Sequence, residues 1–189
     1  MMKSTLVALG LATATQAAIL PESRSTNDDT QTDGCRTNFD GRFEISAAPI
    51  DNSKQRTPSC GTDSDSLVLT LTCGTLKDGR GCTGYIASNH QLQFDAPPQY
   101  NALRTSGFSI CDDNVLALGN SKVFYECLAD KFYNSYDADV APQCRPVMVT
   151  IWPCDGPEST QGGQSEKPQL IWEIADGQIQ TPWTESDES

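Results

Sequence analysis

The chain has 189 residues, with 25 acidic and 13 basic side chains and a formal net charge of −12 at pH 7. This length accommodates one ordinary domain together with tails. The acidic balance excludes nucleic acid as an expected partner, because recognition of phosphate groups needs a basic surface.

Two segments are predicted before the first cysteine. Lys3 precedes an apolar stretch over residues 4–14 that is followed by small residues, so residues 1–17 are predicted to be a secretory signal peptide. The apolar stretch is too short to span a bilayer, and no membrane anchor is expected. Residues 18–34 contain the polar run TNDDTQTDG and are predicted to form a flexible N-terminal segment.

Short strands are predicted within residues 35–154, the segment expected to form a cysteine-rich domain. Apolar and polar side chains alternate with the period of two that is typical of half-buried strands in residues 67–72, 91–94, 108–110 and 147–152. Turn signals rich in Gly, Pro, Asp and Asn separate these stretches, and no convincing helical repeat is found. The predicted fold is therefore all-β, a disulfide-rich antiparallel β-sandwich or barrel, with its topology left open.

Eight cysteines follow the predicted signal peptide. They are Cys35, Cys60, Cys73, Cys82, Cys111, Cys127, Cys144 and Cys154. An even number of cysteines in an exported chain predicts disulfides, here four, whose connectivity the sequence leaves open. Cys73 and Cys82 are the closest pair and could staple a hairpin. A metal site is not expected, because the chain has no CxxC pair and His90 is its only histidine.

The C-terminal segment, residues 155–189, is predicted to be a flexible acidic tail. It carries eight acidic residues and one basic residue, a composition typical of a solvated segment. Its last residues are polar and charged, which is the opposite of the hydrophobic tail that a GPI-anchor signal needs.

No catalytic residue is predicted, and the chain is not expected to be an enzyme. A nucleophile–histidine–acid triad would have to use His90, whose strand-like surroundings favour a surface or cross-strand position. A glycosidase would need two carboxylates that face each other, and the sequence does not bring any two together. The candidates are Asp95, Asp112, Asp113, Asp137 and Asp139.

Aromatic side chains offer another possibility, a platform for sugar rings. Phe124 and Phe132 are predicted to belong to the core. The tyrosines are left open between core and platform: Tyr85, Tyr100, Tyr125, Tyr133 and Tyr136.

Three sequence blocks between Gly84 and Tyr136 occur in an order that resembles one family. The blocks are GYIASNHQLQFDAPPQ, GFSICDDNVLALG and VFYECLADKFYNSY. They resemble the cysteine-containing C-terminal domain of the PIR group of fungal cell-wall mannoproteins, the proteins with internal repeats. The likeness covers about residues 60–154, and the spacing of Cys60, Cys127 and Cys144 also fits. Cys154 is the fourth cysteine of this pattern, closer than usual.

The chain also departs from the family pattern. Four cysteines lie outside the four-cysteine arrangement, and they predict two additional disulfides: Cys35, Cys73, Cys82 and Cys111. The repeats that the family carries before this domain are absent between the predicted signal peptide and Cys35. Ala96 replaces a glycine of the family pattern.

A repeat-like motif is found in the tail instead, at residues 173–180 with the sequence EIADGQIQ. It resembles the PIR repeat Q-[IV]-x-D-G-Q-[IV]-Q, whose first glutamine is understood to form an ester with β-1,3-glucan. Glu173 occupies that first position, and a carboxylate forms such an ester far less readily than an amide, which can release ammonia. Gln178 or Gln180 would therefore have to substitute, and all three are candidate attachment residues.

The resemblance implies a secreted protein of the fungal cell wall. The predicted function is a structural constituent, a mannoprotein retained in the β-1,3-glucan network and in contact with other wall polysaccharides or wall proteins. One alternative is a secreted carbohydrate-binding or host-interaction protein without covalent wall attachment, and a second is a glucan-acting enzyme. The chain has no Asn-x-Ser/Thr sequon, so any glycans are expected to be O-linked mannose at the Ser- and Thr-containing ends.

Overall fold

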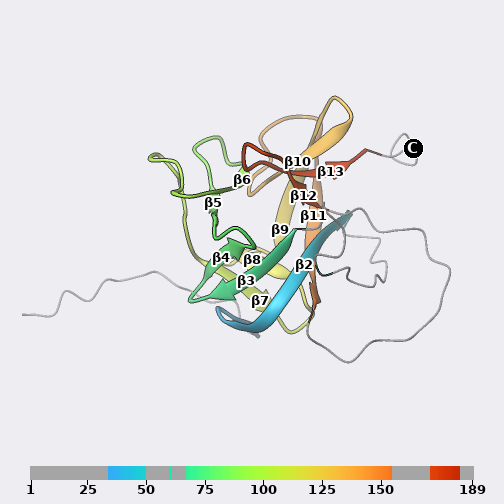
Figure 1. The fold of residues 1–189 in the computed structure, drawn as a ribbon. Helices are drawn as coiled ribbons and strands as arrows, with labels where there is room; N and C mark the ends of the chain where they lie inside the picture. Colours follow the sequence, from blue (N-terminus) through green and yellow to red (C-terminus); the bar gives the residue numbers. More distant parts are fainter. Residues whose placement is uncertain (1–33, 50–59, 61–66, 155–170, 184–189) are drawn as a thin grey trace, which may run out of the picture.

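A computed structural model describes residues 34–49, 60, 67–154 and 171–183 (Figure 1). Within this part of the chain all regular structure is β, with thirteen strands in two sheets and antiparallel pairing throughout. The predicted all-β fold is thus confirmed. The described part of the chain contains no helix with the length and hydropathy of a membrane span.

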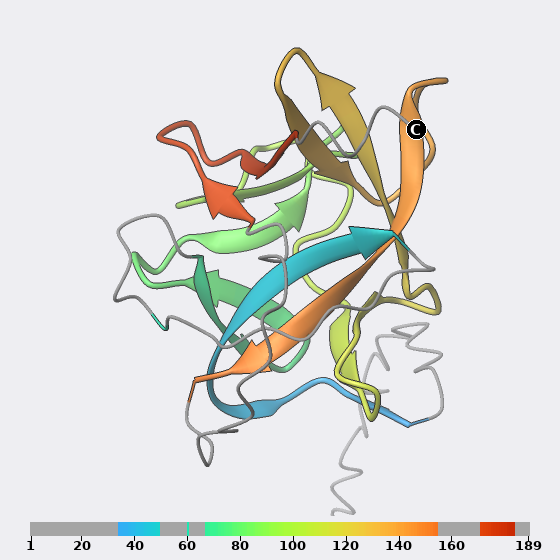
Figure 2. The same ribbon diagram turned by 90° about the vertical axis from the view of Figure 1, so that its right-hand side faces the viewer.

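The larger sheet has ten strands in the order β12-β13-β10-β9-β11-β2-β3-β4-β5-β6. Their bounds are β2 Phe39–Pro49, β3 Val68–Thr72, β4 Thr75–Asp78, β5 Thr83–Ile86, β6 Leu92–Asp95, β9 Val123–Ala129, β10 Phe132–Tyr136, β11 Cys144–Pro153, β12 Trp172–Glu173 and β13 Ile179–Pro182. Most neighbours in this order are joined by short turns, so the sheet is largely a meander. Figure 2 shows it curving round until its two ends approach each other.

The two ends of the larger sheet meet, which makes the domain a nearly closed barrel. Gln91, just before β6, forms a bridge with Tyr136 of β10, and Gln93 of β6 forms a bridge with Gln178, just before β13. The His90 carbonyl also accepts a hydrogen bond of 3.0 Å from the Asp137 N–H. The gap between β10 and β6 is therefore closed partly by direct contact and partly by β13.

The barrel interior is filled by the predicted apolar faces. Leu69 and Leu71 of β3 are buried while the threonines beside them are exposed, and Val147, Val149 and Ile151 of β11 are buried in the same way. This alternation follows from the pleat of a strand, which sends successive side chains to opposite faces. The largest buried side chains also include aromatic residues from several strands: Phe43, Tyr85, Phe94, Phe108 and Phe124.

A smaller sheet of three strands packs on one end of the barrel, in the order β1-β7-β8. Its bounds are β1 Cys35–Arg36, β7 Phe108–Cys111 and β8 Leu116–Leu118. A bridge between Val115 and Thr150 connects it to β11.

Three disulfides join segments that are far apart in the sequence or on neighbouring strands. The pairs are Cys35–Cys111, Cys60–Cys154 and Cys127–Cys144. Cys35 and Cys111 are register partners across β1 and β7, and Cys127 and Cys144 are register partners across β9 and β11.

The predicted hairpin staple between Cys73 and Cys82 is wrong, because both thiols are free. Cys73 lies in the turn that precedes β4, whereas Cys82 lies beyond the other end of β4. A four-residue strand spans roughly 13 Å, and a disulfide needs α-carbons within about 7 Å of each other. The strand geometry therefore keeps the two cysteines apart, and the eight cysteines supply three disulfides and two free thiols.

The tail also differs from its prediction. Residues 171–183 belong to the larger sheet as β12 and β13, so this part of the predicted flexible tail is an ordered element of the barrel. The predicted signal peptide and the remaining tail residues, 155–170 and 184–189, lie outside the described residues.

Candidate functional site

The repeat-like motif forms a β-hairpin. Ile174 and Gln178 close its turn, with a hydrogen bond of 3.0 Å from the Ile174 N–H to the Gln178 carbonyl and one of 2.9 Å from the Gly177 N–H to the Ile174 carbonyl. Asp176 Oδ1 accepts a hydrogen bond from the Gln178 N–H at 3.2 Å. Asp and Gly are suited to such a turn, because Asp bonds to nearby backbone and Gly accepts a positive φ.

Gly177 is required at its position for two reasons. Its φ is +83°, in the left-handed region that side chains disfavour, and a Cβ added there would collide with the carbonyl oxygen of Phe94. The close approach has a function in the fold, since the Phe94 N–H donates a hydrogen bond of 2.7 Å to the Gly177 carbonyl. This bond fixes the hairpin turn against β6.

The hairpin is held in the barrel by backbone pairing and by apolar side chains. β13 pairs with β10, where Gln180 lies opposite Asn134. The Trp183 N–H donates to the Lys131 carbonyl at 3.2 Å. Ile171 and Ile179 are buried in the core. Figure 1 shows β12 and β13 beside β10, with β6 nearby.

The side chain of Gln178 lies between two polar partners. Its Oε1 accepts a hydrogen bond of 2.9 Å from Gln91 Nε2, and its Nε2 donates one of 2.9 Å to Asp176 Oδ2. Gln91 is itself buried, and its Oε1 accepts a bond of 3.1 Å from Gln93 Nε2. Gln178 is half-buried, so its carboxamide is oriented by neighbours and still reaches the surface.

Glu173, the residue at the first position of the motif, is paired with a cation. Its carboxylate forms an ion pair with the Arg80 guanidinium, which also contacts the Asp78 carboxylate at 3.0 Å. The hydrogen bond to Asp78 raises the pKa of Arg80 above its ordinary value. The Glu173 side chain is only 7% exposed, whereas that of Arg80 is 55% exposed. Glu173 is therefore a structural partner of the turn between β4 and β5.

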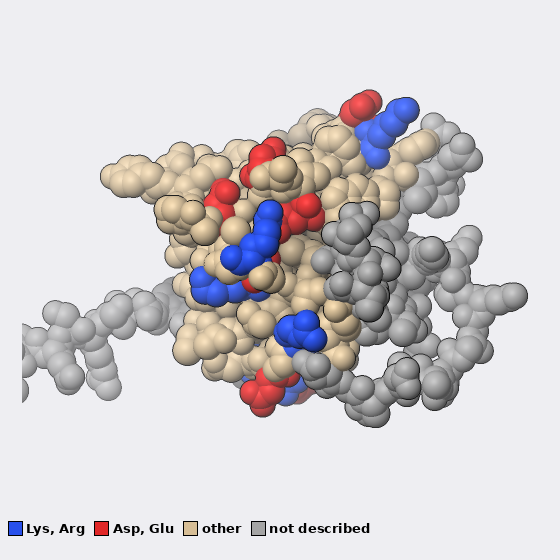
Figure 3. All heavy atoms as spheres, viewed as in Figure 1, with Lys and Arg blue, Asp and Glu red and all other residues tan. Residues whose placement is uncertain are grey.

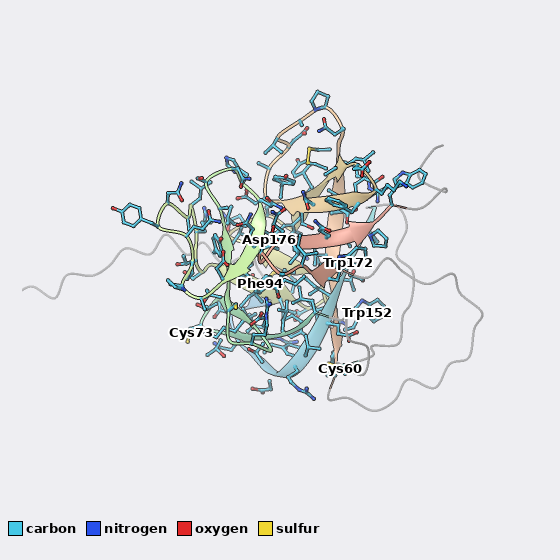
Figure 4. The ribbon with its side chains drawn as sticks, turned by 45° about the horizontal axis from the view of Figure 1, so that its top comes forward. Cys60, Cys73, Phe94, Trp152, Trp172 and Asp176 are labelled. Carbon is cyan, nitrogen blue, oxygen red and sulfur yellow. A yellow bond between two sulfur atoms is a disulfide. The ribbon has the colours of Figure 1, made fainter. Side chains whose placement is uncertain are left out.

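Gln180, the third candidate attachment residue, is buried at 6% exposure. The structure thus brings all three residues into one hairpin but gives them different environments. Figure 4 shows the position of Asp176 at this hairpin, with Phe94 and Trp172 nearby. Gln178 combines a primary amide with partial exposure, which Glu173 and Gln180 do not.

A buried polar cluster next to the hairpin was not predicted from the sequence. The Tyr85 hydroxyl is within hydrogen-bond distance of Asp95 Oδ2 at 2.5 Å and Gln93 Oε1 at 2.8 Å, and Gln99 Nε2 donates to Gln93 Oε1 at 3.0 Å. Burial and the bond to Asp95 raise the pKa of Tyr85 above its ordinary value. The QLQFD stretch signalled only a strand, because its polar residues could equally have faced solvent.

The other candidate residues have separate partners. His90 lies in the turn before β6, and its Nδ1 is 2.9 Å from the carboxylate of Asp137, which follows β10. Asp113 pairs with Lys122 at 2.8 Å, and this contact lowers the pKa of Asp113. Among the described residues no group of three or more His, Cys, Asp or Glu side chains is arranged to hold a metal ion.

The tyrosines do not share one environment. Tyr85 and Tyr133 are buried, and Tyr133 packs beneath Arg145, whose guanidinium carbon lies 4.0 Å from the ring centroid. Tyr100 is fully exposed. Figure 3 shows acidic and basic side chains interspersed on the visible face, without a broad basic patch.

Comparison with known proteins agrees with the resemblance. A family model described as "Cell wall mannoprotein PIR1-like, C-terminal domain" matches residues 74–147, which extend from the turn before β4 into β11. The chain is 49% identical over 88 residues to the cell wall mannoprotein CIS3 of Saccharomyces cerevisiae, a match that covers 46% of this chain and 39% of that protein. No solved structure matches.

Two further relatives extend the comparison. Cell wall protein PIR5 of a Saccharomyces cerevisiae strain is 38% identical over 109 residues, with 57% of this chain and 38% of that protein covered. Cell wall mannoprotein PIR1 of Candida albicans is 37% identical over 121 residues, with 59% of this chain and 31% of that protein covered. The chain thus matches less than half the length of each of these relatives.

The names of these relatives place those proteins in the cell wall, which agrees with the location and the role predicted for this chain. The matched segment includes β6 and β10, which contact the hairpin, whereas the hairpin itself lies after it. Residues 74–147 of this chain are therefore similar to the PIR1-like C-terminal domains of fungal cell wall mannoproteins.

Proposed function

We propose that this protein is a structural constituent of the fungal cell wall that is retained in the β-1,3-glucan network through an ester at Gln178. The observation that carries the proposal is the position of the Gln178 carboxamide, half-buried between Gln91 and Asp176. The family resemblance suggests β-1,3-glucan as the polysaccharide, and the geometry of the hairpin favours Gln178 as the attachment residue.

The attachment step is a transfer of the Gln178 acyl group from nitrogen to a sugar oxygen. The hydroxyl oxygen of the glucan adds to the carboxamide carbon, the carbon–nitrogen bond breaks, and ammonia leaves with the proton of the hydroxyl. During addition, negative charge develops on Gln178 Oε1, where the Gln91 N–H already donates a hydrogen bond. Asp176 accepts a bond from the departing nitrogen and is placed to carry the proton to it.

The same geometry argues against the other two candidate attachment residues. Glu173 has a carboxylate, which would have to expel water or hydroxide, and that carboxylate is engaged by Arg80. Gln180 is buried opposite Asn134, so a polysaccharide chain could reach it only if β13 left the barrel.

Retention of variants in isolated walls tests the proposal. Gln178→Glu keeps the size of the side chain and removes the amide that releases ammonia. Gln143→Glu is a matched control, because Gln143 is an exposed glutamine that lies before β11, outside the motif and its hydrogen-bond partners. Walls of a fungal host that secretes each variant are washed with hot detergent and then treated with mild alkali, which cleaves esters.

We expect the original protein and Gln143→Glu to resist detergent and to be released by alkali, and Gln178→Glu to be lost into the medium or the detergent wash. Equal alkali-released amounts for Gln178→Glu and Gln143→Glu, with both variants folded, would reject Gln178 as the attachment residue. Recovery of the original protein wholly in the medium would instead favour the alternative of a secreted carbohydrate-binding or host-interaction protein. For the alternative of a glucan-acting enzyme, glucan-modifying activity that depends on a carboxylate pair would be required.

A further inference from the structure

We propose that the hairpin of residues 171–183 is an exchangeable element that also docks into a second copy of this chain, giving a dimer in which each barrel is completed by its partner's hairpin. The proposal concerns an interaction surface, the gap between β10 and β6. It goes beyond wall attachment and does not rest on an ester at Gln178.

The gap between β10 and β6 has the backbone groups to pair with an added strand. One side of it is the edge of β10, which pairs with β13 from Phe132↔Pro182 to Asn134↔Gln180, and the other side is β6, which bonds to Gly177 through the Phe94 N–H. Without an occupant, both edges would present unpaired backbone groups, and such edges pair with other strands. The docked hairpin also adds apolar side chains to the core, since Ile171 and Ile179 are buried among residues of the barrel.

Among the described residues, the contacts that hold the hairpin are made with earlier parts of the chain. They come from β10, from β6 and from Arg80 in the turn between β4 and β5. A second copy offers the same contacts in the same geometry, so the docked interface is identical within one chain and between two chains. Exchange of identical elements between protomers is a low-cost route to dimers for this reason.

The chain is long enough between the barrel and the hairpin for exchange to occur. The disulfide Cys60–Cys154 fixes the end of β11, and the 16 residues 155–170 then lead to Ile171. Sixteen residues reach at most roughly 55 Å when fully extended. That reach exceeds the diameter of a barrel of this size, about 30–35 Å, so the hairpin of one copy can enter a neighbouring barrel.

The docked interface is also one that can open. The buried atoms Asn134 Oδ1 and Ser135 Oγ of β10, and Thr181 Oγ1 of β13, have no hydrogen-bond partner among the described residues. Unpaired buried polar atoms disfavour a closed state relative to one in which water reaches them. On one side of the gap, in contrast, β10 pairs with β9, and the disulfide Cys127–Cys144 joins β9 to β11, so this side is held in the sheet independently of the hairpin.

Disulfide trapping with two distinguishable chains tests the exchange. Phe132 and Pro182 are direct register partners across β10 and β13, and both are half-buried. One chain carries Phe132→Cys and is labelled with ¹⁵N, and the other is unlabelled and carries Pro182→Cys. Both chains also carry Cys73→Ser, which removes the exposed free thiol. They are mixed at high concentration, taken through mild partial unfolding and return, and oxidised, and the joined peptides are identified by mass spectrometry.

The matched control replaces Pro182→Cys by Ala175→Cys, an exposed position in the hairpin turn that lies outside the β10 register. A single chain that carries both Phe132→Cys and Pro182→Cys reports docking within one chain. It is expected to form the internal disulfide in dilute solution, where the effective concentration of the tethered hairpin exceeds the concentration of other chains.

Exchange predicts a joined peptide pair between position 132 of the labelled chain and position 182 of the unlabelled chain. The cross-linked fraction should rise about tenfold with a tenfold increase in protein concentration while most chains are single, by mass action. No labelled–unlabelled pair, or an equal yield with Ala175→Cys, would overturn the proposal. Failure of the single double-cysteine chain to close its internal disulfide would overturn it as well, because the hairpin would then not occupy the gap. None of these outcomes depends on modification of Gln178, so failure here is distinguishable from failure of the proposed attachment.

Discussion

Substitution of Gly177 by alanine tests the docking of the hairpin most sharply. Gly177 has a φ of +83°, and its α-carbon faces the Phe94 carbonyl so closely that an added Cβ would collide with it. A left-handed conformation costs an alanine roughly 1–2 kcal/mol. Relief of the collision requires the turn to move away from β6, which gives up the Phe94 N–H bond and about 1 kcal/mol more.

Two other glycines supply matched controls for this substitution. Gly81 has a φ of +86° and open space around its Cβ position, so Gly81→Ala carries the conformational cost without the collision. Gly79 has open space and no positive φ, so Gly79→Ala carries neither. The expected order of destabilisation is therefore Gly177→Ala, then Gly81→Ala, then Gly79→Ala with little effect.

Hydrogen exchange of the Phe94 amide measures the effect where it is expected. A loss of roughly 2–3 kcal/mol in the free energy of opening the hairpin speeds exchange at this amide about 30- to 150-fold. Gly81→Ala should leave the Phe94 amide close to its original rate, because its strain lies in the turn between β4 and β5. Equal exchange rates at Phe94 in the Gly177→Ala and Gly81→Ala proteins would refute the close packing of the motif against β6.

Three further predictions follow from single contacts. Ile179→Ala should lower the free energy of unfolding by about 2–5 kcal/mol in urea titration, because Ile179 is fully buried in the barrel core; a change below about 1 kcal/mol would contradict a core position for the motif. Cys73 should react with a thiol reagent in the folded, non-reduced protein much faster than Cys82, because Cys73 is exposed and Cys82 is half-buried against the core. Mass spectrometry of the modified peptides measures this order, and faster reaction of Cys82 would contradict the exposure of Cys73 in the turn before β4. Lys122→Met should return the pKa of Asp113 toward 3.8 in an NMR titration. Since the folded-state pKa is lowered, the stabilisation is present above the ordinary value and is lost as pH falls through the lowered one, and for so exposed a pair it should not exceed about 1 kcal/mol.

The strands of the barrel were predictable because each carries its signal locally. Leu69 and Leu71 alternate with threonines, and Val147 alternates with polar or half-buried neighbours along β11, so burial of one face follows from the pattern itself. The closure of the sheet was not predictable, because it depends on bridges such as Gln93↔Gln178 between residues far apart in the chain.

The tail was misjudged for a related reason. The charges and small residues after Cys154 are typical of a solvated segment, and the short strand around Ile179 gains its stability only from a gap that other strands create. Likewise, spacing alone suggested a bond between Cys73 and Cys82, whereas the position of β4 between them keeps them apart. The Asp-Gly pair at residues 176–177 was the one local signal of the turn. The sequence could not show that the turn packs closely against Phe94.

Part of the candidate site was predictable from the sequence and part was not. The resemblance of residues 173–180 to a PIR repeat named Glu173, Gln178 and Gln180, and the chemistry of the ester already disfavoured Glu173, but the sequence could not choose between the two glutamines. The choice comes from their contacts, those of Gln178 with Gln91 and Asp176 and that of Gln180 with the buried surface of β10.

Mass spectrometry of wall-bound protein tests the central claim most directly. Walls are washed free of non-covalently held protein and digested with β-1,3-glucanase, and the peptide spanning residues 171–183 is recovered without exposure to alkali. The proposed attachment predicts a peptide that carries a hexose esterified to position 178, where the glutamine has lost ammonia. Mild alkali should hydrolyse this ester and leave glutamate, instead of the original glutamine, at position 178. Recovery of wall-bound peptide with Gln178 unmodified, or with the hexose on Glu173 or Gln180, would contradict the proposal.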